Sequence, residues 1–286
     1  MLRIATYNLL HGMPVIGGMP RPERDDDGRF TGPPQHTDDA ALRTSATILD
    51  ADIVGLQEVD RYQPRSGGHD QTAVVADALG AAHHLFAPSV IGTPGSPDEW
   101  HAATAEDDID PSGEHDRRAM YGVGLVSRLP VLDWRIERFN PSRASLPLLV
   151  PGENRRPQFI SVADEPRAAI IAVIEGANGP FTVATAHLSF VPGTNGRQLR
   201  ELVRRTRDLP RPFLLFGDFN LPGRWPRTLT GFRSLASGAT YPSFSPRIQF
   251  DHVLADGLAV DARTQATVHT LPVSDHCAVS VDLDLP

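Results

Sequence analysis

Apolar and polar residues alternate along the chain in many short runs, a pattern typical of β-strands with one buried face. The first run covers residues 2–7 and leads directly into Asn8. Later runs of the same kind are bounded by Gly, Pro, Asn or Asp, as strands usually are. They predict strands over residues 53–57, 121–127, 131–138, 168–174, 181–186, 213–216, 250–254, 267–271 and 278–283.

A helical period is confined to three segments. The first begins near Thr37, with Thr37 or Asp38 as its N-cap. The second covers residues 72–79 and is closed by Gly80, a common residue after a helix C-terminus. The apolar face of the first helix is predicted to comprise Leu42, Ile48 and Leu49, with Ser45 among them. The third, within residues 197–211, has Leu199, Leu202, Val203 and Leu209 on one face and five arginines on the other.

Three segments show neither pattern and are predicted to be irregular: residues 12–36, 88–118 and 140–166. Long loops inside a compact domain usually serve function or are disordered. No repeat, low-complexity tract or linker divides the chain. Short strands with a few helices therefore predict one α/β domain over residues 1–286, with largely antiparallel sheets.

The length of 286 residues allows a core that needs neither a metal nor a disulfide for stability. A bound metal would therefore be expected to serve catalysis. The single Cys277 excludes an internal disulfide and a cysteine-based zinc site, and we interpret it as a packing residue. Without a signal-peptide pattern or an apolar run of about 18 residues, a soluble cytoplasmic monomer is expected.

Charge narrows the possible partners. Arginine supplies all 27 basic residues against 35 acidic ones, so the formal net charge is −8. Proteins that grip long duplexes usually carry a basic face, which this balance does not favour. The absence of lysine excludes a Schiff base and a P-loop phosphate lysine, and no Gly-x-Gly-x-x-Gly motif follows a predicted strand.

Polar residues recur at the C-terminal ends of short apolar strands, where a side chain is rigidly held yet open to substrate. Each alone has an ordinary explanation as a turn residue, a surface ion pair or a core histidine. Their repetition is the stronger signal. The set comprises Asn8, Glu58, His187, Asp218 with Asn220, Asp251 with His252, and Asp275 with His276.

This set suits phosphoester hydrolysis assisted by a hard cation. Mg²⁺ and Mn²⁺ prefer oxygen ligands, and Glu58 supplies a carboxylate for such an ion. Asp218 is positioned in the sequence to deprotonate a water, with Asn220 as an orienting amide. His276 beside Asp251 would provide an imidazole ordered by a carboxylate.

With these residues, the sequence resembles the endonuclease/exonuclease/phosphatase superfamily. This superfamily includes pancreatic-type deoxyribonucleases, abasic-site endonucleases, inositol polyphosphate 5-phosphatases and neutral sphingomyelinases. The matching motifs follow one another over nearly the whole chain. Gly-Asp-Phe-Asn and Ser-Asp-His are the most specific of them. In order, the motifs are Thr6-Tyr7-Asn8, Leu56-Gln57-Glu58, residues 121–128, Thr185-Ala186-His187-Leu188, Gly217-Asp218-Phe219-Asn220, Phe250-Asp251-His252 and Ser274-Asp275-His276.

The resemblance implies a four-layer α/β/β/α sandwich of two mainly antiparallel sheets flanked by helices, with Mg²⁺ or Mn²⁺ at one edge. It implies a metal site formed by Glu58, Asn8 and Asp275. It implies that Asp218 and Asn220 position the water and that His187 contacts the scissile phosphate. It further implies an Asp251–His276 pair and a phosphate contact from Tyr121.

The sequence departs from some nucleases of the family at Leu10, where they place an acid. His11 matches no family element, while Arg118 and Arg167 suit either substrate anions or ion pairs. Residues 98–118 carry eight carboxylates against two arginines, which would repel a duplex. We therefore expect hydrolysis of a compact phosphodiester or phosphomonoester. The alternatives are a DNA or RNA endo- or exonuclease, for which the arginine-bearing helix would be a local basic stripe, and a non-catalytic binding domain.

Overall fold

Two β-sheets make up the centre of the computed structural model, which describes residues 1–16, 19–20, 23–24, 30–32, 39–93, 100–108, 117–151 and 157–285. The first sheet has seven strands, in the order β18 (Thr264–His269), β19 (Ala278–Leu283), β1 (Leu2–Asn8), β6 (Ile53–Arg61), β9 (Met120–Ser127), β7 (His83–Gly92) and β8 (Trp100–Ala102). The second has six, in the order β10 (Val131–Phe139), β13 (Arg167–Ile174), β14 (Phe181–His187), β15 (Phe213–Asp218), β17 (Asp251–Asp256) and β16 (Arg233–Ser234).

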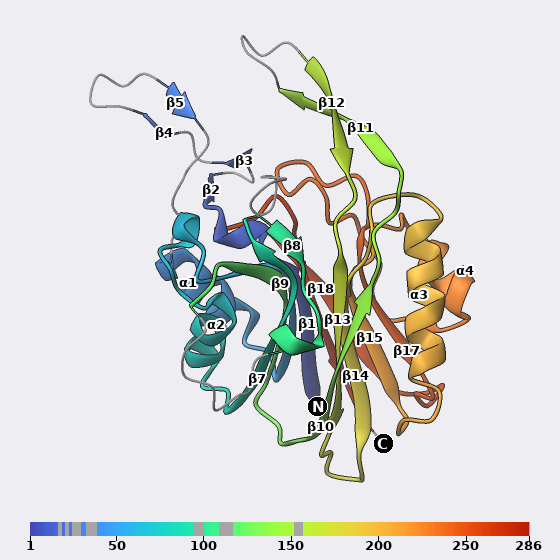
Figure 1. The fold of residues 1–286 in the computed structure, drawn as a ribbon. Coiled ribbons are helices and arrows are strands. Elements are labelled where there is room, and N and C mark those ends of the chain that lie inside the picture. The colour runs from blue at the N-terminus through green and yellow to red at the C-terminus, as the bar shows by residue number, and fades with distance from the viewer. Residues whose placement is uncertain are drawn as a thin grey trace.

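Helices cover the outer faces of both sheets. Figure 1 shows α1 (Asp39–Leu49) and α2 (Gln71–Leu79) beside the first sheet, and α3 (Thr194–Arg205) and α4 (Trp225–Thr230) beside the second. Three apolar clusters fill the spaces between these four layers. Only β1–β6 and β14–β15 pair in parallel among the described ladders of these two sheets. The predicted four-layer α/β/β/α sandwich of two mainly antiparallel sheets is therefore confirmed.

The most apolar strands lie where both faces of a sheet are covered. All eight residues of β13 are buried, and so are all seven of β14. Alternate residues of β13 face the cluster between the sheets, and the others face the cluster beneath α3. Burial on both sides explains why these strands are nearly continuous apolar runs in the sequence.

The helix predictions are confirmed in part. The side chain of Asp70 caps α2 by accepting hydrogen bonds from two backbone N–H groups, and Gly80 closes it with a left-handed φ of 63°. In α1, Ile48 was expected on the buried face but is 51% exposed, because the helix turns Ala46 inward instead. The third helix ends at Arg205, so Leu209 packs from the turn beyond it. Thr37 and Asp38 lie outside the described residues.

The segments predicted to be irregular contain strands that the pattern missed. The short strands β2 (Val15–Ile16), β3 (Met19–Pro20), β4 (Glu23–Arg24) and β5 (Phe30–Gly32) lie within the first of them. In the second, β7 continues to Gly92 and is followed by β8 and the 3₁₀ turn η3 (Ala105–Asp107). The third contains the hairpin of β11 (Ser145–Pro151) and β12 (Pro157–Ala163), which projects beyond the sandwich in Figure 1.

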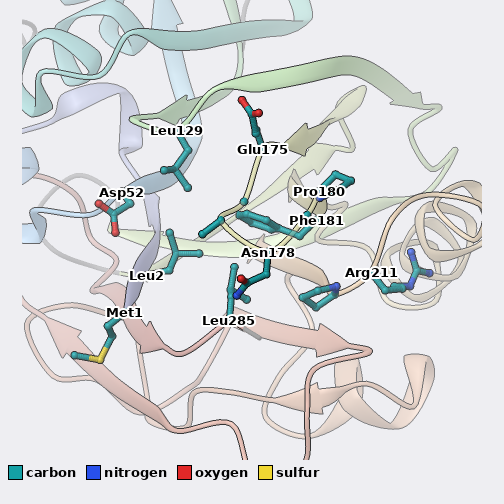
Figure 2. Close-up of a pocket in the computed structure, with 14 residues that line it drawn as sticks. Met1, Leu2, Asp52, Leu129, Glu175, Asn178, Pro180, Phe181, Arg211 and Leu285 are labelled. Carbon is teal, nitrogen blue, oxygen red and sulfur yellow. The ribbon is translucent and has the colours of Figure 1, made fainter.

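A cavity of about 400 Å³ opens at the end of the sandwich near the chain termini (Figure 2). Met1 and Leu2 at the start of β1 line it, together with Phe181 at the start of β14. The cavity therefore lies at the opposite end of these strands from Asn8 and His187, which end them. No helix in the described part of the chain has the length and apolar character needed to cross a membrane.

Candidate active site

The strand-end residues meet at one end of the sandwich because of the strand directions. Asn8 ends β1, and His187 and Asp218 end the parallel strands β14 and β15. Strand β17 runs antiparallel to β15, so Asp251 lies opposite Asp218 at the start of β17, and not at the C-terminal end of a strand as the pattern predicted. Strand β19 runs antiparallel to β1 in the same way, which places His276, two residues before β19, at this end too. Residues from distant parts of the chain thus share one edge.

Asn8 joins the two sheets at this edge. Its side-chain N–H groups donate to Glu58 Oε1 and to Asp218 Oδ2, both at 3.0 Å. Its Oδ1 accepts a hydrogen bond from the backbone N–H of Leu10 at 3.0 Å. The Leu10 contact fixes which way the amide faces, so that its nitrogen points to the carboxylates. Asn8, itself buried, therefore holds the carboxylates of Glu58 and Asp218 close together.

Glu58 reaches the site through an irregularity in β6. The pairing of β6 with β9 shifts register between Leu56 and Val59, and Glu58 has a φ of 54°. A positive φ is strained for a residue with a side chain and is often found at functional sites. The preceding Gln57 is anchored by its amide, which donates to Thr185 Oγ1 of the facing sheet at 2.9 Å. The bulge therefore aims the carboxylate away from the ladder and toward the site.

The Gly-Asp-Phe-Asn motif forms a tight corner after β15. A Cβ on Gly217, whose φ is 150°, would lie 2.1 Å from the carbonyl oxygen of Ala186, so only glycine fits. The backbone N–H of Asn220 donates to Asp218 Oδ1 at 2.9 Å. The Asn220 amide donates to the Leu188 carbonyl at 3.0 Å and lies 3.3 Å from His187 Nε2. Asp218 and Asn220 therefore form an Asx turn, and this turn also places their side chains next to each other.

Asp251 and His276 form a buried pair. His276 Nδ1 lies 2.9 Å from Asp251 Oδ2, and its Nε2 lies 3.8 Å from Asp218 Oδ2. Burial lowers the pKa of His276, but the negative charges of Asp251 and Asp218 outweigh it and raise that pKa well above the usual value. The ring of Tyr241 packs 4.9 Å from the imidazole. The imidazole is therefore held as a cation in a fixed orientation.

His187 has a different environment. Burial, followed by the charge of Arg167, lowers its pKa well below the usual value, so the ring is neutral. Arg167 Nη1 lies 3.0 Å from His187 Nδ1, and the side chain of Arg167 is 5% exposed. The Nε of Arg167 is buried without a hydrogen-bond partner in the described part of the chain. The sequence left Arg167 open between an ion pair and an anion contact, and its nearest carboxylate, on Asp164, is 4.0 Å away.

Tyr121 and Asp275 complete the predicted set. Tyr121 is buried in β9, and burial together with the charge of Glu58 raises the pKa of its hydroxyl well above 10. Burial raises the pKa of Asp275 to about 6, and the charge of Glu58 adds to this effect. Both residues thus interact electrostatically with Glu58. His252, which the sequence pattern had grouped with Asp251, instead contacts the Leu221 carbonyl at 2.8 Å on the far side of the strand.

The acids of this site repel one another, which suits a cation. Burial raises the pKa of Glu58, and Asp218 raises it further. The pKa of Asp218 is raised by burial and by Asp251. The buried Oδ1 of Asp251 has no hydrogen-bond partner among the described residues. Asp218, Asp251 and His276 have potential ligand atoms within 4.8 Å of one another. Buried oxygens of this kind fit a hard divalent ion.

Three other residues noted in the sequence lie apart from this chemistry. Burial lowers the pKa of His11 to about 3, with a contribution from Arg65, so its side chain is a neutral packing group. Arg118 pairs with Asp107 at the surface, 3.1 Å away. Cys277 is fully buried. None of the three contacts the acids described above in the hydrogen bonds and ion pairs of the described residues.

The chain belongs to the endonuclease/exonuclease/phosphatase family, whose model matches residues 5–276. The match includes every strand-end residue of the site. The suspected resemblance is thus confirmed, although no curated protein sequence matches the chain.

Solved structures of low sequence identity share the fold. An endonuclease/exonuclease/phosphatase from Beutenbergia cavernae matches with a TM-score of 0.57 and 19% identity, over 99% of this chain and 71% of that one. A mannosyl-6-phosphatase from Bacteroides thetaiotaomicron matches over 100% of both chains, with a TM-score of 0.55 and 16% identity. A sphingomyelinase C from Streptomyces griseocarneus matches over 98% of both, with a TM-score of 0.57 and 15% identity.

Proposed function

We propose that this protein is a divalent-metal-dependent phosphoesterase that cleaves a P–O ester bond by direct attack of water, without a covalent enzyme intermediate. The single observation that carries this proposal is the convergence of Glu58, Asp218 and His276. They come from three distant parts of the chain and are linked through Asn8 and through the 3.8 Å approach of His276 to Asp218. A mannosyl-6-phosphatase and a sphingomyelinase C among the structures of similar fold support phosphate-ester chemistry.

The proposed roles follow from these environments. Asp218, whose pKa is raised by burial, accepts the proton of the attacking water, and Asn220 orients that water. His276 acts as a cation that stabilises the negative charge on the phosphate, while Asp251 fixes its ring. His187, Arg167 and Tyr121 contact the phosphate oxygens. The water oxygen forms a bond to phosphorus as the ester P–O bond breaks, and the leaving oxygen takes a proton from solvent.

Glu58 and Asp275 would hold Mg²⁺ or Mn²⁺, and Asn8, whose amide nitrogen donates to Glu58, would orient that carboxylate. The bound ion would offset negative charge on the phosphate and on the leaving oxygen. The mutual repulsion of the carboxylates supports this assignment, because a cation would relieve it. The site draws on both sheets, which supports treating residues 1–286 as a single domain.

The charge around the site favours a compact substrate over a nucleic acid. The arginine-bearing face of α3 is partly neutralised, since Arg205 pairs with Glu137 and Glu201. Neutralised arginines gain little from phosphate contacts along a duplex. We therefore infer a compact phosphodiester or phosphomonoester. The test is a parallel assay of plasmid, single-stranded oligonucleotide, bis-p-nitrophenyl phosphate and p-nitrophenyl phosphate with Mg²⁺ or Mn²⁺. Faster cleavage of the two small esters is expected, and exclusive cleavage of the nucleic acids would favour a nuclease.

Added Mn²⁺ is expected to raise the melting temperature, and to raise it more at pH 8 than at pH 5. The pKa of Asp275 is raised to about 6, and those of Glu58 and Asp218 are also raised. Without a cation, these groups lower the stability as the pH rises from about 4 to about 6, because the unfolded chain ionises in this range before the folded chain does. Bound Mn²⁺ offsets this cost only where the acids are ionised.

Thermal melting with and without Mn²⁺ at both pH values measures this shift. Glu58→Gln is expected to remove most of it, whereas Glu175→Gln, at the cavity on the opposite end of the sandwich (Figure 2), should retain it. An equal shift in the protein and in Glu58→Gln would contradict the assignment of Glu58.

A further inference from the structure

Arg65 is a preorganised cation on the Glu58 side of the site. It lies in the 3₁₀ turn η2 (Pro64–Ser66), and its Nε and Nη2 each donate to a different carboxylate oxygen of Asp60 at 2.8 Å. The Asp60 side chain is fully buried, and that of Arg65 is 28% exposed. A bidentate contact fixes the plane of the guanidinium as well as its position. Arg65 is therefore a rigid group that is partly exposed to solvent.

The position of Arg65 is set by the strands that carry the site. Asp60 lies two residues after Glu58 in β6 and pairs across the ladder with Tyr121 of β9. The guanidinium of Arg65 lies 5.8 Å from the centre of the Tyr121 ring. Burial lowers the pKa of Arg65, but Asp60 raises it more strongly, and Tyr121 and Glu58 add to that effect. Arg65 thus interacts electrostatically with two residues of the proposed site.

Neutralising Asp60 does not use all of the hydrogen-bonding capacity of Arg65. A guanidinium carries five N–H donors, and the contact with Asp60 uses only those of Nε and Nη2. Within the described residues, Nη1 makes no hydrogen bond. The charges of Arg65 and Arg167 both lower the pKa of the Tyr121 hydroxyl, whereas the charges of Glu58 and Glu165 raise it. Two guanidinium groups therefore lie near Tyr121, and Nη1 of Arg65 has no acceptor among the residues that the structure describes.

We propose that Arg65 is a specificity-determining residue that binds a second anionic group of the substrate, beside the phosphate that is cleaved. The substrate class would then be phosphate esters with a further carboxylate or phosphate. This inference rests on the proposed phosphoesterase activity and narrows its substrates. A guanidinium fork matches either anion, because both present two oxygens in one plane.

Matched pairs of substrates test this subsite. Glycerol 3-phosphate and 3-phosphoglycerate differ by a carboxylate, and fructose 1-phosphate and fructose 1,6-bisphosphate differ by a phosphate. The kcat/KM for each, and for p-nitrophenyl phosphate, is measured from the released phosphate or nitrophenol at a fixed free Mg²⁺ concentration. The full chain is expected to prefer the second member of at least one pair by about 10-fold or more, as a charge-assisted hydrogen bond would give.

Arg65→Gln should remove this preference, mainly through KM, and Arg65→Lys should restore part of it, since it keeps the charge but not the fork. Arg43→Gln serves as the control, because Arg43 pairs with Asp77 on the surface of α1. If Arg65→Gln fails to fold with Asp60 left unpaired, the double variant Asp60→Asn/Arg65→Gln removes both charges together. Loss of the preference in the folded variant supports the subsite.

Two outcomes separate the failure of each inference. If the full chain hydrolyses these esters without preferring a second anion, or if the folded Arg65 variants keep that preference, the subsite proposal is overturned and the phosphoesterase proposal stands. If the full chain hydrolyses none of the compounds, p-nitrophenyl phosphate included, the proposed activity on compact phosphomonoesters is overturned, and the subsite proposal falls with it.

Discussion

Asp218→Asn is expected to lower kcat for phosphate-ester hydrolysis by about 10³-fold, within the range by which a positioned general base accelerates a reaction. The variant keeps the shape of the side chain and a hydrogen-bonding oxygen for Asn8, but it cannot accept the proton of water at neutral pH. Because burial raises the pKa of Asp218, its charge costs stability in the native protein. The melting temperature of the variant without metal should therefore be unchanged or higher. Steady-state assays and thermal melts measure the two effects.

Asp256→Asn is the matched control for this variant. Asp256 lies at the other end of β17, opposite Phe213 at the start of β15, and pairs with Arg211 at 2.8 Å. Its replacement should leave kcat unchanged and cost at most about 1 kcal/mol, as for an exposed ion pair. Retention of more than a tenth of the activity in Asp218→Asn would exclude Asp218 as the base.

His276→Gln is expected to lower kcat by about 10²-fold to 10³-fold, as the loss of one preorganised donor at a developing charge does. The acids around His276 keep it protonated, and we expect the protonated form to be the active one. Activity should therefore rise as Asp218 ionises near pH 6, and fall again as the pH rises through the raised pKa of His276. The pH profile of kcat measures this alkaline limb, which His276→Gln should lack.

A variant of Asp251 tests whether the alkaline limb reports the titration of His276, and a variant of His269 is its control. Asp251→Asn removes the hydrogen-bonded acid, so the pKa of His276 should fall and the alkaline limb should move to lower pH. His269→Gln is the control, because His269 contacts Ser280 at 2.8 Å in the first sheet and no residue of the proposed site in the hydrogen bonds described. An alkaline limb that stays in place in Asp251→Asn would show that another group titrates.

Proline explains why the sequence pattern missed three of the longer strands. Pro88 interrupts the apolar run of β7, and the structure accommodates it at a shift in register between Pro88 and Val90. The hairpin of β11 and β12 contains Pro147, Pro151 and Pro157, which make its strands look like a loop. By contrast, β13 and β14 were predicted almost to the residue, because burial on both faces leaves an unbroken apolar run.

The candidate site could be predicted from the sequence as a set of residue types at strand ends, but its connections could not. The pattern placed polar groups at the ends of several strands, and parallel or antiparallel pairing then brought these groups to one edge. The bridge from Asn8 to both acids depends on how the two sheets face each other. The contact of Arg65 with Asp60 depends on a turn after β6 that has no distinctive motif. Contacts of this kind join residues that are far apart in the sequence or lie in irregular turns, so the hydrophobic periodicity of the sequence does not predict them.

The proposed function requires that hydrolysis depend on a divalent cation held by Glu58. The protein is treated with EDTA, dialysed, and assayed with bis-p-nitrophenyl phosphate and p-nitrophenyl phosphate before and after addition of Mg²⁺ or Mn²⁺, alongside Glu58→Gln. Activity should be lost on chelation and restored by either ion, and Glu58→Gln should need a much higher ion concentration or remain inactive. Full activity of the metal-free protein, or the same ion dependence in Glu58→Gln, would contradict a cation site built around Glu58.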